Sequence, residues 1–263
     1  MKNITSHLLT ALAITVASLT VQAETAEEKG LRIANEMDQQ ESGFIDSVAE
    51  LTMELKNKQG DTSLREIRLK TLEVKNDGDK SLSIFDTPKD VKGTAFLTFS
   101  HSKIPDEQWL YLPSLKRVKR ISSRNKSGPF MGSEFAFEDM ASQEVDKYTY
   151  KYLRDETVNN TDCYVIERYP TYKNSGYKRL ITWINKKDLR PEKIEFYDRK
   201  NSKLKTLSFS QYKLYLDRYW RADTMFMENH ITGKSTTLSW KSYRFKTGLK
   251  SKDFSRNSLK RAR

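Results

Sequence analysis

The pattern of apolar and polar residues predicts one helix followed by a long series of strands. Within residues 25–40 the apolar residues recur at helical intervals, at Leu31, Ile33, Ala34 and Met37. Thr25 and Glu28 have the spacing of a capping box, which satisfies free N–H groups at the start of a helix. We therefore expect an amphipathic helix over residues 25–40 that is ended by Gly43.

From Phe44 onward the apolar residues recur at every second position, which is the period of a β-strand. Turn sequences at 58–61 and 76–79 follow the first two strands. Further strand-like runs occupy residues 94–100, 108–112, 117–122, 147–155, 163–169, 178–184, 193–199, 203–213, 225–230 and 236–245. Because no helix of useful length lies between them, we expect a single antiparallel sheet in one domain, residues 24–263.

A large antiparallel sheet with few helices must curl, and its concave face then needs a cover. We expect that cover from the N-terminal helix, from residues 88–92 and from a short helix near 138–143. A cavity remains wherever these covers leave the concavity unfilled. In the second strand the apolar residues change phase between Leu64 and Ile67, which indicates a β-bulge.

Aromatic residues are numerous, with 12 Phe, 13 Tyr and 4 Trp, and several strands carry them in one alternating register. They either form an ordinary core wall or line a site for an acyl chain or another apolar ligand. The candidate cavity residues are Trp109, Tyr111, Phe130, Met131, Phe135, Phe137, Trp183 and Trp240. Four of them belong to a glycine-containing loop, which we expect to place Phe130, Met131, Phe135 and Phe137 over the cavity mouth.

Residues 1–23 have the organisation of a cleavable signal peptide. Lys2 gives the positive start, residues 8–21 form a mostly apolar run, and Val21-Gln22-Ala23 is a small-residue cleavage pattern. An uncleaved membrane anchor is the alternative, but a spanning helix needs about 20 strongly apolar residues. We therefore expect an exported chain that begins at Glu24 and contains no transmembrane segment.

The chain is basic, with a formal net charge of +12, and Lys2 is the only charge before Glu24, so the part after the signal carries about +11. Such a field attracts anionic partners, and an exported chain meets lipid head groups or acidic protein surfaces rather than nucleic acid. For most of the cations, a solvated surface that aids solubility is the alternative explanation.

The densest group of cations, six within residues 116–126, directly follows an aromatic strand. The candidates for binding a phosphate or carboxylate head group, or a partner, are Lys116, Arg117, Lys119, Arg120 and Arg124. Arginine suits this role because its planar group can bind two oxygens at once. A solvated edge strand, protected by charge against aggregation, remains the alternative.

Catalytic and metal-binding patterns are absent from the sequence. His101 and His230 have no metal-ligand spacing, and the single cysteine, Cys163, cannot complete a zinc site and is expected to be buried at a strand start. Glu138 and Asp139 are adjacent, so we expect them to cap a short helix or to pair with cations. We expect no enzyme activity, metal or cofactor, although an exported hydrolase whose residues assemble only in space stays open.

The segments 110–121 (LYLPSLKRVKRI) and 127–140 (SGPFMGSEFAFEDM) closely resemble the LolA-like outer membrane lipoprotein-sorting protein family of Gram-negative bacteria. The resemblance extends over nearly the whole chain after the signal. It implies a mainly β (α+β) fold, an incomplete antiparallel β-barrel of about eleven strands whose concave face is capped by helices over an apolar cavity.

The resemblance also implies a periplasmic carrier of lipid or acylated lipoprotein. This subgroup resembles proteins encoded beside inner-membrane transporters of the resistance-nodulation-division (RND) type, which implies a relay from such a transporter to the outer membrane. We expect the carrier to be a monomer. The alternative is an adaptor or sensor that docks on an envelope transporter or regulator through its basic edge.

Overall fold

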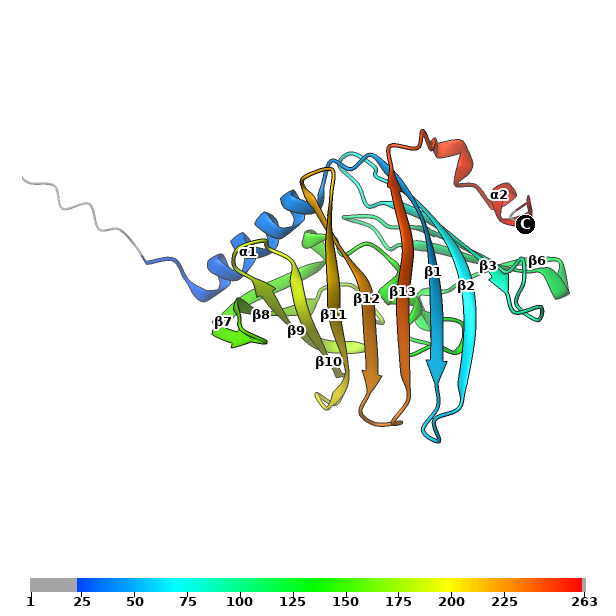
Figure 1. Ribbon diagram of the computed structural model, residues 1–263. Coiled ribbons are helices and arrows are strands. Elements are labelled where there is room, and N and C mark those ends of the chain that lie inside the picture. Colours follow the sequence, from blue (N-terminus) through cyan, green and yellow to red (C-terminus); the bar gives the residue numbers. More distant parts are fainter. Residues whose placement is uncertain (1–22, 262–263) are drawn as a thin grey trace, which may run out of the picture.

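A computed structural model describes residues 23–261, so the expected signal peptide lies almost wholly outside the described residues. Within these residues 13 strands form one antiparallel sheet in the order β6-β5-β4-β3-β2-β1-β13-β12-β11-β10-β9-β8-β7. The sheet is strongly curved, and its two edge strands, β6 and β7, are not paired with each other (Figure 1). The expected half-open antiparallel barrel is thereby confirmed.

The first half of the sheet contains β1 (Asp46–Lys56), β2 (Thr62–Leu72), β3 (Lys80–Thr87), β4 (Ala95–Phe99), β5 (Glu107–Leu112) and β6 (Arg117–Arg120). The second half contains β7 (Tyr148–Val158), β8 (Thr161–Pro170), β9 (Tyr177–Asn185), β10 (Pro191–Asp198), β11 (Lys203–Tyr215), β12 (Tyr219–Asn229) and β13 (Ser235–Phe245). The α-helices are α1 (Ala26–Glu41) and α2 (Arg256–Arg261). Short 3-10 turns are η1 (Pro113–Leu115), η2 (Ser123–Asn125), η3 (Phe130–Gly132), η4 (Phe137–Met140), η5 (Val145–Lys147) and η6 (Ser251–Asp253).

The strand number exceeds the eleven or so that the resemblance implied. Each of the ten strand-like runs from residue 94 onward forms a strand of its own, and β1, β2 and β3 precede them. The register of β2 against β3 shifts between Glu66 and Ile67, but the extra residue of this bulge, Asp86, lies in β3 rather than in β2. Along β2 the pairing with β1 has no shift, so Leu64 is exposed and Ile67 buried because residues three apart lie on opposite faces of a regular strand, which corrects the expectation of a bulge there.

The chain starts in the middle of the sheet at β1, proceeds outward to β6, and then crosses to the opposite edge at β7. We call residues 121–147, which make this connection, the crossing segment. They lie behind the strands in Figure 1, on the concave side of the sheet. From β7 the chain returns strand by strand to β13, which pairs with β1. The crossing segment is therefore held between the two halves of the sheet.

The N-terminal helix has the predicted cap. The backbone N–H of Glu28 donates to Thr25 Oγ1 at 3.2 Å, and the N–H of Thr25 donates to Glu28 Oε2 at 2.9 Å. Ile33 is fully buried in the main core, and α1 lies along β7 (Figure 1). At the closest approach a Cβ on Gly30 would lie 2.8 Å from the carbonyl carbon of Lys151, so this position requires glycine.

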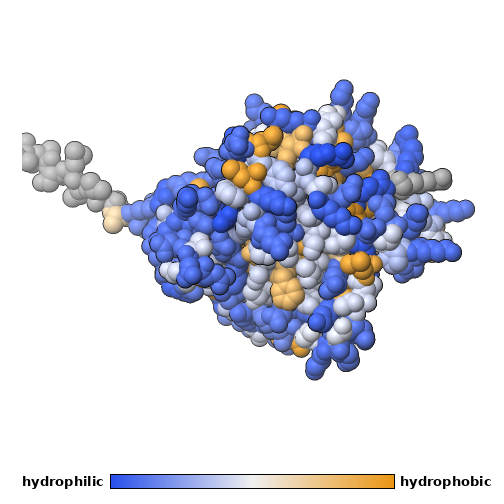
Figure 2. Space-filling view, viewed as in Figure 1, coloured by the Kyte–Doolittle hydropathy of each residue, from blue (hydrophilic) through white to orange (hydrophobic). Residues whose placement is uncertain are grey.

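The other expected covers differ from the prediction. Residues 137–140 form a 3-10 turn rather than a longer helix, and residues 88–92 form a turn from which Val91 packs against the core. The short C-terminal helix α2 covers part of the opposite, outer face, where Leu259 joins a separate apolar cluster. The side of the molecule in Figure 2 is mostly hydrophilic, with apolar residues scattered over it. The main apolar cluster thus lies inside the curve of the sheet.

Candidate ligand cavity

The concave side of the sheet encloses two adjoining cavities. The inner chamber, of about 390 Å³, is lined mainly by apolar side chains, among them Leu51, Ile67, Leu207, Phe209, Leu238 and Trp240. The outer chamber, of about 870 Å³, is lined by more polar and charged side chains. Both chambers are lined by Leu69, Arg168 and Met225, so they meet at these residues. Their volumes fall within the range of about 300–1,000 Å³ that is usual for small-molecule sites.

The crossing segment forms the floor of the inner chamber. Phe130 is 1% exposed, and its ring lies 5.0 Å from that of Phe96 and 6.0 Å from that of Phe85. Two of the contacts that fix the floor to the sheet involve Arg65 and Glu134. Arg65 donates from its guanidinium to the carbonyl of Met131, and the N–H of Glu134 donates to Thr236 Oγ1 at 3.0 Å.

The outer chamber lies toward the opposite end of the strands. It is lined by Met37 of α1, by Phe44 just before β1, by Trp220 near the start of β12, and by Tyr243 near the end of β13. Thr236, by contrast, lies at the start of β13, near the floor. The glycine-containing loop therefore closes the inner end of the cavity, which corrects the expectation that it covers the mouth.

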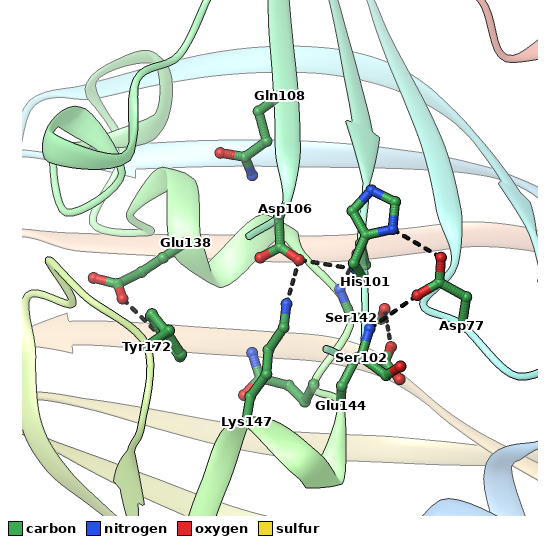
Figure 3. A network of polar contacts seen from close by, with 12 residues as sticks. Asp77, His101, Ser102, Asp106, Gln108, Glu138, Ser142, Glu144, Lys147 and Tyr172 are labelled. Carbon is green, nitrogen blue, oxygen red and sulfur yellow. Dashed lines mark hydrogen bonds and ion pairs between the residues drawn. The ribbon is translucent and has the colours of Figure 1, made fainter. Parts of the chain in front are cut away.

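A network of polar contacts anchors the crossing segment to β5 and to the loop between β4 and β5 (Figure 3). Lys147 donates to the carboxylate of Asp106, whose backbone carbonyl accepts from Lys126 Nζ at 2.7 Å. Gln108 Nε2 donates to the carbonyl of Phe137 at 2.7 Å, and the N–H of Ser142 donates to Ser100 Oγ at 2.8 Å. Burial lowers the pKa of Lys126.

Glu138 and Asp139 attach the segment to the other half of the sheet. Glu138 is buried and accepts from the N–H of Gly176 at 2.7 Å and from Ser175 Oγ at 2.8 Å. Burial, together with the adjacent Asp139 carboxylate, raises the pKa of Glu138. Asp139 pairs with Lys205 Nζ at 2.7 Å and caps the η4 turn through the N–H of Ala136. The prediction of a cap and a cation partner is confirmed for Asp139. The donors that bind Glu138 come from Tyr172, Ser175 and Gly176, and all three are uncharged.

Three of the eight predicted cavity residues, Phe130, Phe135 and Trp240, line the inner chamber. Met131 and Phe137 pack against the surrounding core. The other three residues, Trp109, Tyr111 and Trp183, face the outer side of the sheet, which corrects the expectation for them.

Successive residues of a strand alternate between its two faces, so the neighbours of an outward-facing aromatic residue face the core. In β5 it is Leu110 that joins the main core, while Trp109 packs beside Leu259 of α2. Trp183 packs with Cys163, and Lys193 Nζ lies 3.7 Å from the centre of its ring.

The five predicted basic residues, Lys116, Arg117, Lys119, Arg120 and Arg124, are exposed on β6 and its flanking turns, and none of them lines either chamber. Arg120 pairs with Glu107 at 2.9 Å. Because β6 is an edge of the sheet, this basic edge is a surface separate from the cavity.

Sequence reasoning missed Arg168, which lines both chambers and is 5% exposed. The available signal was its alternation with Ile166 in β8, since Ile166 belongs to the main core and residues two apart share a face. An arginine on the apolar face of a strand is unusual because burial of its charge is unfavourable.

Acidic side chains line the outer chamber, in contrast to the basic surface of the chain. Asp38, Asp79 and Glu144 are among them. Burial is the main cause that raises the pKa of all three, and the nearby Glu144 carboxylate adds to it for Asp79. The pKa of Asp79 is thereby raised to about 7.

Cys163 is fully buried near the start of β8, as predicted. Burial raises the pKa of its thiol to about 11, which disfavours the reactive thiolate. Across residues 23–261 no group of three or more His, Cys, Asp or Glu side chains is placed to hold a metal ion. In the same residues no helix is both long and apolar enough to cross a membrane.

The chain is similar in sequence and fold to several known proteins. A family model described only as that of an uncharacterized protein matches residues 77–261. The crystal structure of an outer membrane lipoprotein-sorting protein domain from Vibrio parahaemolyticus is 58% identical, with a TM-score of 0.88, covering 89% of this chain and 99% of that one. A DUF1329 family protein from Desulfovibrio piger is 31% identical, with a TM-score of 0.85 and coverage of 89% and 99%.

A LolA superfamily protein from Nitrosomonas europaea has the same fold, with 21% identity, a TM-score of 0.71, and coverage of 90% of this chain and 100% of that one. The comparison with curated proteins returned no match.

Proposed function

This chain belongs to the LolA-like outer membrane lipoprotein-sorting protein family, and we propose that it is a periplasmic carrier that holds the acyl chains of a lipid or acylated lipoprotein in its inner chamber. The observation that carries this proposal is the chamber itself. Apolar side chains from both halves of the sheet line it, and the aromatic floor closes one end.

The physical basis is the hydrophobic effect. Each CH₂ group moved from water into such a chamber contributes about 0.8 kcal/mol, so an acyl chain of ordinary length gains enough to remain bound during transit. The adjoining outer chamber offers a route by which a chain can enter and leave while its polar end stays near water.

The proposed location has separate support. The first 23 residues have the pattern of a secretory signal, and the absence of a membrane-spanning helix in residues 23–261 fits a carrier that moves between membranes. We propose that it relays its cargo, as a monomer, between an inner-membrane transporter of the RND type and the outer membrane.

The experiment is to export the full-length chain to the periplasm of a Gram-negative host, purify it without detergent, and record native mass spectra. The proposal predicts a bound species that is released by organic solvent and identified as a lipid or an acylated peptide. Protein that carries no such species, even after incubation with phospholipid vesicles, would contradict the carrier function.

A second candidate is an adaptor or sensor that docks on an envelope transporter through the basic edge. The exposed cations of β6 and its flanking turns favour it, because an edge strand bearing like charges attracts an acidic surface. Co-purification of a membrane partner without bound lipid, lost when Arg117 and Lys119 are both changed to glutamate, would select this function instead.

A further inference from the structure

Arg168 is a buried cation that forms no ion pair with any acidic side chain in residues 23–261. It lies on β8 at the junction of the two chambers, and in the part of the chain that the structure describes its Nε has no hydrogen-bond acceptor. No carboxylate of residues 23–261 forms an ion pair with its guanidinium, which lies 4.9 Å from the centre of the Tyr148 ring. That ring supports the cation from one side but supplies no oxygen to its N–H groups.

A buried guanidinium is stabilised by hydrogen-bond acceptors, above all by negatively charged oxygens. Its five N–H donors match the oxygens of a carboxylate or phosphate, and such charge-assisted bonds are about twice as strong as neutral ones. Leaving a buried charge unpaired is destabilising, so a side chain of this kind on an apolar face requires an explanation.

Two further side chains of the cavity wall have unpaired hydrogen-bonding atoms. Thr182 Oγ1 in the outer chamber and Trp240 Nε1 in the inner chamber are buried and have no partner in residues 23–261. The register pairs Arg168 with Leu180 and Ile166 with Thr182, so Arg168 and Thr182 are diagonal neighbours on one face. Among the described residues, the cavity wall therefore holds three buried atoms without hydrogen-bond partners, and two of them, Arg168 Nε and Trp240 Nε1, can only donate.

The charges around the inner chamber are consistent with an anion at this point. Arg168 is the only cation among the described residues that line it, and Asp139 is already paired with Lys205. Asp79 is the other acidic residue in its wall, and burial, which raises the pKa of that carboxyl, disfavours its negative form.

We propose that Arg168 binds the oxyanion head group, a carboxylate or a phosphate, of an amphiphile whose acyl chain occupies the inner chamber. This inference rests on the carrier function proposed above and narrows its cargo to anionic lipids. Arg168 acts as a specificity residue, since it adds affinity only for ligands that carry the oxyanion.

The test compares ligands that share one twelve-carbon chain. Dodecanoate and dodecyl phosphate carry the oxyanion, dodecanol has the same chain without charge, and inorganic phosphate has the charge without the chain. Dissociation constants are measured by calorimetry on the full-length protein after its lipid has been removed. We expect both anions to bind at least about tenfold more tightly than dodecanol, and inorganic phosphate to bind far more weakly than dodecyl phosphate.

The variants are Arg168→Met, which removes the charge at similar length, Arg168→Lys, and Arg244→Met as an exposed control on β13. Arg168→Met should abolish the preference for the anions and leave dodecanol binding unchanged. Arg168→Lys should retain part of the preference, and Arg244→Met all of it.

The outcomes separate the two proposals. Equal binding of dodecanol and the anions by the native protein would overturn the role of Arg168 while leaving a carrier of neutral chains. A uniform loss for all ligands in Arg168→Met would show a structural role and also overturn the inference, as would inorganic phosphate binding as tightly as dodecyl phosphate. Failure of every twelve-carbon ligand to bind would instead contradict the carrier function itself.

Discussion

Lys205 on β11 donates a hydrogen bond of 2.7 Å to the carboxylate of Asp139 in the crossing segment, and both side chains are almost completely buried. The pair connects the floor of the inner chamber to the second half of the sheet. The same carboxylate accepts from the Tyr177 hydroxyl at 2.9 Å, so the contact belongs to a wider network.

Replacing Lys205 by methionine should leave a buried carboxylate without its cation and lower the free energy of unfolding by about 3–5 kcal/mol. Lys205→Met combined with Asp139→Asn should recover part of that loss. The control is Lys241→Met, which breaks the exposed pair with Glu66 and should cost less than about 1 kcal/mol. Equal effects of the two lysine variants in urea unfolding would show that the buried pair does not anchor the floor.

Filling the cavity should remove lipid without unfolding the sheet. Met225 of β12 lines both chambers, and Met225→Trp would place a larger side chain in the space assigned to the acyl chain. The matched control is Phe226→Trp, one residue along the same strand on the exposed face. Lipid recovered by extraction should fall several-fold in the first variant only. Undiminished lipid in Met225→Trp would argue against the inner chamber as the binding site.

Asp79 should make stability depend on pH. Its pKa is raised to about 7 in the folded chain from an ordinary value of 3.8, so the folded state binds the proton more tightly than the unfolded state. The stabilisation from this proton is complete below about pH 4 and is lost as the pH rises through about 7.

The variant Asp79→Asn lacks this proton equilibrium. Between about pH 4 and about pH 8 it should gain stability relative to the native chain, by at most about 4 kcal/mol. Glu54→Gln, on the exposed face of β1, is the control. Parallel stability curves for the native chain and Asp79→Asn across this range would contradict the assignment.

Removing the unpaired charge of Arg168 should stabilise the lipid-free protein. Arg168→Met removes a buried cation whose Nε has no acceptor in residues 23–261, and we expect the free energy of unfolding to rise by about 1–3 kcal/mol. Arg179→Met on the adjacent strand is the contrasting variant, because Arg179 is paired with Glu167 at 2.7 Å and its loss should destabilise. Destabilisation of similar size in both variants would indicate that Arg168 is an ordinary structural residue.

Much of the fold could be predicted because it follows from local patterns. The capping box at Thr25 and the alternation in β1 depend on neighbouring residues alone, and both are present. Alternation alone, however, does not tell which of two apolar faces turns inward. For β5 both faces are apolar, and the outcome depends on α2, which packs over Trp109 from the far end of the chain.

The site was harder to predict for the same reason. Aromatic character singled out Phe135 and Trp240, which do line the inner chamber. Arg168 could not be predicted as a cavity residue from the sequence, because a single cation in a basic chain forms no recognisable local pattern. Its significance depends on the lack of an acceptor for its Nε among residues 23–261, and the residues that surround it come from distant parts of the sequence.

The central claim is that an acyl chain lies in the inner chamber, and contact quenching of tryptophan fluorescence by brominated fatty acids tests it most directly. One variant keeps Trp240 alone, in the chamber wall, and a second keeps Trp183 alone, on the outer face, with phenylalanine at the other tryptophan positions. We predict strong, saturable quenching of Trp240 and none of Trp183. Equal quenching of both, or an unquenched Trp240 at saturating ligand, would contradict the account.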